Sequence, residues 1–132
     1  MYLVDTNVWL ERLLEQERSG EVREFLAQTP SNSLHITDFA LHSIGIILTR
    51  LGHLEGFGRF VQDLLVEGGV TLVRLGPEDL MELINVIQSF SLDFDDAYQY
   101  VGSAKHNLTL VSFDSDFDRT ELGRKTPVQV LQ

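Results

Sequence analysis

The chain has no cysteine among its 132 residues. This excludes disulfide bonds and every zinc or iron–sulfur site built on cysteine ligands. It also lacks an apolar run long enough to cross a bilayer, so we expect no membrane contact. No basic segment followed by an apolar stretch opens the sequence, because Asp5 comes directly after Met1 to Val4. We therefore expect no signal peptide and favour a cytoplasmic protein.

Basic side chains are scarce: 10 Lys and Arg stand against 20 Asp and Glu, a formal net charge of −10. Nucleic acids are usually bound through basic patches, so this balance argues against them as ligands. A bound divalent cation, however, reverses the sign of the charge at a site. The composition is thus compatible with a metal-dependent nuclease without favouring one.

Phosphate-binding and nucleophile motifs are missing as well. Neither GxxxxGK[ST] nor GxGxxG occurs, and no serine lies in a nucleophile-elbow sequence. The four histidines are scattered without a close pair of metal ligands, which argues against a zinc site.

Short hydrophobic segments alternate with helical patterns along the chain, which predicts a single α/β domain over residues 1–132. We expect a three-layer α/β/α fold with a central, mostly parallel sheet of about five strands. The helix over residues 39–51 is apolar nearly all round, so we expect it to be largely buried. The expected strands are residues 2–4, 34–36, 70–75, 108–111 and 128–131.

Acidic residues stand at three of the expected strand–helix junctions. Asp5 follows the first strand, Asp96 opens a late helix, and Asp114 and Asp116 follow the fourth strand. Each alone is explained as a helix cap or turn former. In a parallel sheet, however, they would meet at one edge. Two carboxylates about 4 Å apart repel by roughly 4 kcal/mol at an effective dielectric near 20. A hard divalent cation removes that cost, so we predict a divalent-metal site.

These residues resemble the PIN-domain family, and in size most closely the VapC-like toxin ribonucleases, over nearly the whole chain. The segment Asp5-Thr6-Asn7 looks like the family's first motif, Asp95-Asp96-Ala97 like its third, and residues 110–117 like its fourth. The resemblance implies a Mg²⁺- or Mn²⁺-dependent endoribonuclease that hydrolyses RNA phosphodiester bonds. It further implies that Asp5, Asp96 and Asp114 bind the metal and that Asp116 assists them. A toxin role with a small antitoxin protein as partner, and a homodimer, are also implied.

One departure from the family pattern concerns a glutamate expected early in the helix after the second strand. Ser43 stands at that position and brings no negative charge. The site would then either bind one metal and remain active, or bind metal weakly. In the second case the chain would be a catalytically impaired module that holds RNA or a protein partner.

Further side chains are expected to support the site. Thr6 or Ser112 would orient a ligand carboxylate, although capping and turn formation explain both equally well. Asn7 is expected to cap the first helix rather than to act in catalysis. Phosphate contacts would come from basic residues near the motifs, namely Arg12, Lys105, Arg119, Arg124 and Lys125.

Two other classes of phosphoryl-transfer protein gather acids at strand ends but fit this sequence poorly. A haloacid-dehalogenase-like phosphatase needs Asp-x-Asp after its first strand, where this chain has Asp5-Thr6-Asn7. A receiver domain needs an aspartate after its third strand, where Arg74-Leu75-Gly76 stands.

Overall fold

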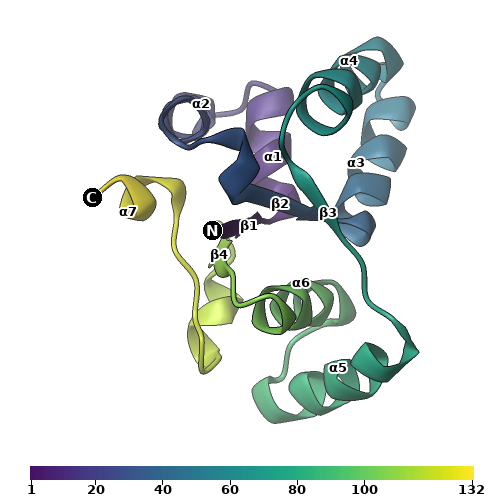
Figure 1. Cartoon of the computed structure of the whole chain (residues 1–132), viewed down its shortest axis with the longest axis vertical. Coiled ribbons are helices and arrows are strands. Elements are labelled where there is room, and N and C mark those ends of the chain that lie inside the picture. Colours follow the sequence, from purple (N-terminus) through teal and green to yellow (C-terminus); the bar gives the residue numbers. More distant parts are fainter.

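A computed structural model describes all 132 residues, and its central layer is a sheet of four parallel strands (Figure 1). The strand order is β3-β2-β1-β4, so the first strand of the chain lies between the second and the last. The strands are short: β1 Tyr2–Val4, β2 Leu34–Thr37, β3 Thr71–Val73 and β4 Thr109–Val111. Because all four run the same way, their carboxyl ends lie along one edge of the sheet.

Helices cover both faces of this sheet (Figure 1). One face carries α1 Thr6–Leu13, α2 Ser19–Gln28, α3 Asp38–Arg50 and α4 Leu54–Phe60, the last continued by a π-helical turn over Val61–Val66. The other face carries α5 Pro77–Phe90 and α6 Phe94–Lys105. Short 3-10 turns cover Ser31–Ser33 and Ser115–Arg119, and α7 Pro127–Leu131 ends the chain. No helix is both long and apolar enough to cross a bilayer.

Two hydrophobic cores, one on each face, hold the layers together. Successive strand residues point to opposite faces, so Val4 joins the core that contains Trp9 and Phe25. Its neighbour Leu3 joins the second core, with Leu110 and residues of α5 and α6. This arrangement confirms the predicted three-layer α/β/α fold.

The fifth strand predicted over residues 128–131 is wrong, because this segment forms α7. Pro127 occupies the first turn of that helix, and Thr126 and Gln129 form a capping box at its start. These signals select a helix despite the alternating apolar pattern. In place of a fifth strand, the free edge of β4 has a single isolated parallel bridge, between Val111 and Lys125.

The expectation that residues 39–51 are largely buried is also wrong. Only Ala40, Ile44 and Leu48, spaced four residues apart, are buried in α3. Ile46 and Leu51 are 52% and 54% exposed. The helix therefore packs along one face, and its outer face exposes Ile46 among polar side chains, namely His42, Thr49 and Arg50.

Candidate metal centre

Asp5 lies at the end of β1, where it caps α1 and is almost completely buried. Its Oδ1 accepts hydrogen bonds from the Thr6 backbone N–H at 2.8 Å and from Gln99 Nε2 at 2.9 Å. Its Oδ2 accepts a hydrogen bond from Ser112 Oγ at 2.7 Å. A carboxylate has about four lone-pair sites, so one acceptor site on Oδ2 is left for a cation.

Gln99 is fixed from its other side by Thr37. The Thr37 hydroxyl donates to Gln99 Oε1 at 2.6 Å and accepts the Ala40 N–H at 3.0 Å as the N-cap of α3. Thr37 is fully buried and Gln99 is 2% exposed. Since the Gln99 amide oxygen is held by Thr37, its NH₂ group points at Asp5. This chain of bonds joins the carboxyl ends of β1 and β2 through α6.

Ser112 links β1 to the segment after β4. Its hydroxyl donates to Asp5 and accepts from the Asp114 N–H at 2.9 Å and from Asn7 Nδ2 at 3.3 Å. Asn7 Oδ1 accepts the Phe113 N–H at 3.2 Å. Asn7 thus ties α1 to the loop after β4, and the expectation that it caps α1 is wrong because Asp5 is the cap.

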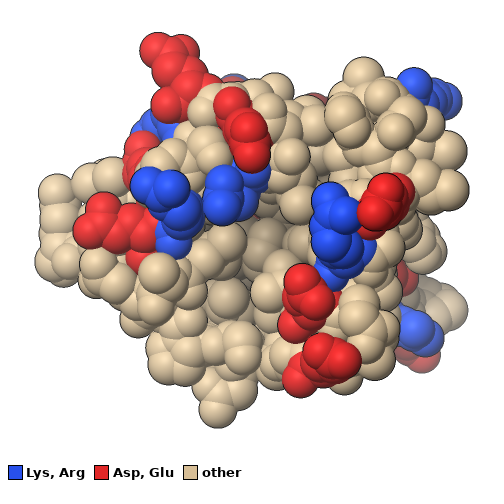
Figure 2. All heavy atoms as spheres, turned by 90° about the horizontal axis from the view of Figure 1, so that it is seen from above, with Lys and Arg blue, Asp and Glu red and all other residues tan.

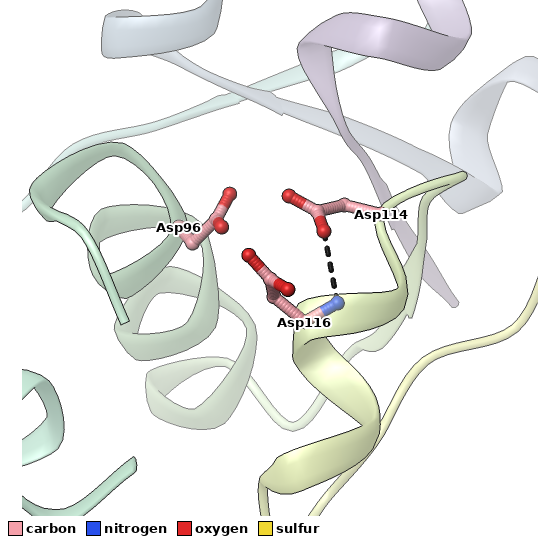
Figure 3. Close-up of side chains that lie close together, drawn as sticks. All are labelled: Asp96, Asp114 and Asp116. Atoms are coloured by element: carbon pink, nitrogen blue, oxygen red, sulfur yellow. Dashed lines mark hydrogen bonds between the residues drawn. The ribbon is translucent and has the colours of Figure 1, made fainter. Parts of the chain in front are cut away.

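Three carboxylates converge on one another (Figure 3), close enough to Asp5 for the charges of Asp5, Asp96 and Asp114 to interact. Asp96 reaches in from the first turn of α6, while Asp114 and Asp116 come from the turn after β4. One carboxylate oxygen from each residue lies within 4.8 Å of the others. The turn is held by a hydrogen bond from the Asp116 N–H to Asp114 Oδ1 at 2.9 Å. We call Asp96, Asp114 and Asp116 the acidic cluster.

The acidic cluster has the donor set of a site for a hard cation. Asp96 is 8% exposed, and its Oδ2 is buried without a hydrogen-bond partner. An unpartnered buried carboxylate oxygen is costly, and a cation would satisfy it. All available ligands are carboxylate oxygens, the type that Mg²⁺ and Mn²⁺ prefer. Asp5 lies next to the cluster rather than within it.

Without a cation, the surroundings of Asp96 and Asp5 oppose their ionisation. Burial raises the pKa of Asp96 to about 8, together with the closeness of the Asp114 carboxylate and the charges of Asp93 and Asp5. Burial also raises the pKa of Asp5, while hydrogen bonds from Gln99, Ser112 and Thr6 oppose that rise. Competition with protons should therefore weaken metal binding below neutral pH.

A pocket of about 320 Å³ opens beside these groups. Asp5, Asp96 and Gln99 line it together with Ser43 of α3. Ser43, which stands at the position where a glutamate was expected, therefore faces the pocket. The other residues that line the pocket are Thr6, Asn7, Leu10, Phe39, Ile47 and Asp95.

The basic residues proposed for phosphate contacts are placed differently from one another. Arg119 lies at the site, with its Nη1 3.6 Å from Asp116. Lys105 is at the opposite end of α6 from Asp96, about 13 Å along the helix, and pairs with Asp79 at 2.7 Å. Arg124 donates to the Ser112 carbonyl oxygen at 3.1 Å and pairs with Asp118 at 3.2 Å, so its role is to hold the turn after β4. Arg12 donates to Ser19 at 3.4 Å.

Sequence reasoning missed Gln99, Thr37 and Arg18. The Arg18 guanidinium lies 4.0 Å from the centre of the ring of Phe113, the residue before Asp114 in the sequence. Gln99 is one turn after Asp96, so its place on the same side of α6 was readable from the sequence. No local signal places Arg18 beside Phe113, because that contact depends on the packing of distant segments.

Positive charge is dispersed on the face shown in Figure 2, where Lys and Arg lie beside Asp and Glu rather than in one continuous patch. Each of the five ion pairs of the chain joins a basic side chain to a nearby carboxylate. This face therefore has no continuous basic patch, in keeping with the net charge of −10.

Comparison with known proteins gives a consistent picture. Residues 2–122 match the model of the PIN domain family. A toxin–antitoxin complex from Klebsiella pneumoniae has a similar structure, with a TM-score of 0.76 and 19% identity over 96% of this chain and 98% of that one. The sarcin–ricin-loop-cleaving toxin VapC20 of Mycobacterium tuberculosis is similar with a TM-score of 0.79 and 16% identity, over 92% of this chain and 96% of the toxin chain. FitAcB from Neisseria gonorrhoeae is similar with a TM-score of 0.76 and 16% identity, over 97% of this chain and 99% of that chain. The curated proteins gave no match.

Proposed function

Because this chain belongs to the PIN domain family, we propose that it is a metal-dependent endoribonuclease that hydrolyses RNA phosphodiester bonds. The observation that carries this proposal is the acidic cluster, with the unpartnered Asp96 Oδ2 inside it. The proposed chemistry is argued from these side chains.

Asp96, Asp114 and Asp116 would hold Mg²⁺ or Mn²⁺ together with Asp5. When bound, the divalent cation supplies positive charge that activates a water and stabilises charge developing on the phosphate. Asp5 offers one remaining acceptor site on Oδ2, so we expect it to bind through a single oxygen or through water. Arg119, half-exposed beside Asp116, is the basic side chain best placed to contact a phosphate.

We further propose that the protein is the toxin of a toxin–antitoxin pair. Two of the structural relatives are described as a toxin–antitoxin complex and as a toxin that cleaves the sarcin–ricin loop. The proposed partners are RNA as substrate, a small antitoxin protein and a second copy of the chain in a homodimer. Ile46 of α3 and Leu51, which directly follows that helix, are exposed apolar residues available for such contacts.

A second function is favoured by Ser43, which lines the pocket without supplying a carboxylate. In that case the chain would be a catalytically impaired module that holds RNA or a protein partner. Metal affinity separates the two proposals, because only the nuclease requires the acidic cluster to bind a cation at millimolar concentration or below.

The test is cleavage of an end-labelled, mixed-sequence RNA pool with Mg²⁺, with Mn²⁺ and with EDTA. Asp96→Asn keeps the size of the side chain and removes its charge, so it should abolish metal-dependent cleavage. Asp63→Asn is the matched control, because Asp63 is exposed on the π-helical turn. Folded wild-type protein that cleaves with neither metal yet binds RNA would favour the binding module. Equal cleavage by wild type and Asp96→Asn would contradict a catalytic role for the cluster.

A further inference from the structure

Three aromatic rings pack together at the edge of the pocket, and one of them, Phe39, lines it. Phe39 comes from the first turn of α3, and Phe94 and Tyr98 come from successive turns of α6. The centre of the Phe39 ring lies 6.0 Å from that of Phe94 and 5.3 Å from that of Tyr98. The ring centres of Phe94 and Tyr98 lie 6.3 Å apart. We call these residues the aromatic cluster.

Tyr98 and Phe39 hold the cluster in place. Tyr98 is 8% exposed, and its hydroxyl donates to Asp38 Oδ1 at 2.7 Å. The same hydroxyl oxygen accepts the Leu75 N–H at 3.3 Å. Phe39 packs against the core beneath α5 and α6 and also lines the pocket. The two rings form a fixed support for Phe94.

Phe94 itself is not explained by the fold. It is 49% exposed and belongs to neither hydrophobic core. It lies two residues before Asp96 and next to Asp95, which lines the pocket. Single exposed apolar residues are common on protein surfaces. This one is distinguished by its packing against Phe39, which lines the pocket, and against Tyr98.

The charges around Phe94 limit what can lie on it. Asp93 and Asp95 flank it directly, and both are exposed. Carboxylates on both sides repel a phosphate group, whereas the uncharged face of a nucleobase is tolerated. Base–aromatic stacking needs no positive charge, which suits a chain with a net charge of −10.

We propose that Phe94, supported by Phe39, is the stacking site for an unpaired nucleobase beside the phosphate to be cleaved. This inference rests on the proposed ribonuclease function. A base can reach the ring only when it is unstacked, so the substrate would be a single-stranded segment or loop rather than a duplex. Since every base has a π face, the site selects unpaired RNA without selecting its sequence.

The test compares steady-state cleavage of a short single-stranded RNA by wild type, Phe94→Leu and Phe94→Trp. A stacked base contributes enough affinity that Phe94→Leu should raise KM by about five- to tenfold, with kcat changed less than about twofold. Phe94→Trp keeps an aromatic face and should leave KM unchanged or lower it. Ile84→Ala is the control for losing an exposed apolar side chain, because Ile84 is 47% exposed on α5.

A second readout follows the base directly. A fluorescent base analogue is placed next to the cleavage site, and binding is measured in the Asp96→Asn background so that the RNA stays intact. Its emission should fall on binding when position 94 is Phe or Trp and should not fall when it is Leu.

The possible outcomes separate this inference from the function on which it rests. Wild type that neither cleaves nor binds RNA would overturn both. Cleavage with the same KM in wild type and Phe94→Leu would overturn the stacking site and leave the nuclease standing. Unchanged KM together with a change from dimer to monomer in Phe94→Leu would assign the ring to a protein interface instead.

Discussion

Replacing Gln99 with leucine removes two buried hydrogen bonds without a large change in side-chain volume. The Asp5 carboxylate loses the donor at 2.9 Å, and the Thr37 hydroxyl loses the acceptor at 2.6 Å. All three residues are at most 5% exposed, so water cannot replace the lost partners without a rearrangement. The substitution therefore tests whether Gln99 holds Asp5 in position.

The expected cost follows from these two losses. A hydrogen bond to a charged group contributes about 1.5–3 kcal/mol, and a buried unsatisfied hydroxyl costs about 1–3 kcal/mol. Burying the apolar leucine side chain offsets roughly 1–2 kcal/mol of this sum. We expect Gln99→Leu to lower the free energy of unfolding by about 2–4 kcal/mol, which leaves a typical domain folded.

Metal binding should respond as well. The bond from Gln99 is the largest contribution that opposes the rise in the pKa of Asp5. Its removal should raise that pKa further and weaken Mg²⁺ binding at neutral pH. Urea unfolding in EDTA gives the stability, and calorimetric titration with Mg²⁺ gives the affinity.

Gln88→Leu is the matched control, since Gln88 is an exposed helical glutamine on α5. Its free energy of unfolding should stay within about 0.5 kcal/mol of wild type. If Gln99→Leu also stays within that range and binds Mg²⁺ as wild type does, the positioning role of Gln99 is refuted.

Three further predictions concern the same edge of the sheet. Ser43→Glu adds a carboxylate to the pocket, so it should lower stability in EDTA and strengthen Mg²⁺ binding about tenfold, equivalent to about 1.4 kcal/mol; unchanged calorimetric affinity would contradict this. In the metal-free protein the pKa of Asp96 is about 8, against 3.8 for an ordinary aspartate, so its stabilising contribution is complete below about pH 4 and is lost as pH rises through about 8. The Tm in EDTA should accordingly fall across that range relative to Asp96→Asn, and saturating Mg²⁺ should reduce the fall; a Tm difference that does not depend on pH would refute the assignment. Asn7→Ala removes the bonds to the Phe113 N–H and to Ser112 and should cost about 1–2 kcal/mol in urea unfolding, whereas a cost below about 0.5 kcal/mol would show that Asn7 does not hold the loop.

The parts of the fold that the sequence predicts correctly are those set by local pattern. Hydrophobic strands followed by acids placed Asp5 and Asp114 at one sheet edge, because parallel strands align their carboxyl ends. Asp96 reaches the same edge from the first turn of α6, which follows α5 rather than a strand. The predicted strand at 128–131 failed because alternating Val128 and Val130 outweighed the helix signals of Thr126 and Pro127. In this case the correct signals were present in the sequence, and the weighting was wrong.

Other features depend on contacts between distant segments and cannot be read locally. The bond between Gln99 and Asp5 spans 94 residues, and the one between Thr37 and Gln99 spans 62. Periodicity showed that α3 is apolar, but the exposure of Ile46 depends on what the rest of the chain leaves uncovered. The separation of Asp5 from the acidic cluster likewise follows from side-chain orientation after packing.

The strand order has a consequence for the timing of synthesis. β1 is made first, yet one of its two neighbours is β4, which is made last and pairs with it from Tyr2 and Thr109 to Val4 and Val111. Asp5 and Ser112 are 107 residues apart, a gap of roughly 5–20 s at ordinary translation rates. During that interval Asp5 lacks Ser112, and Asp114 and Asp116 do not yet exist. On a nascent chain the proposed RNA-cleaving site is therefore incomplete until residues 109–116 have been made and have paired with β1.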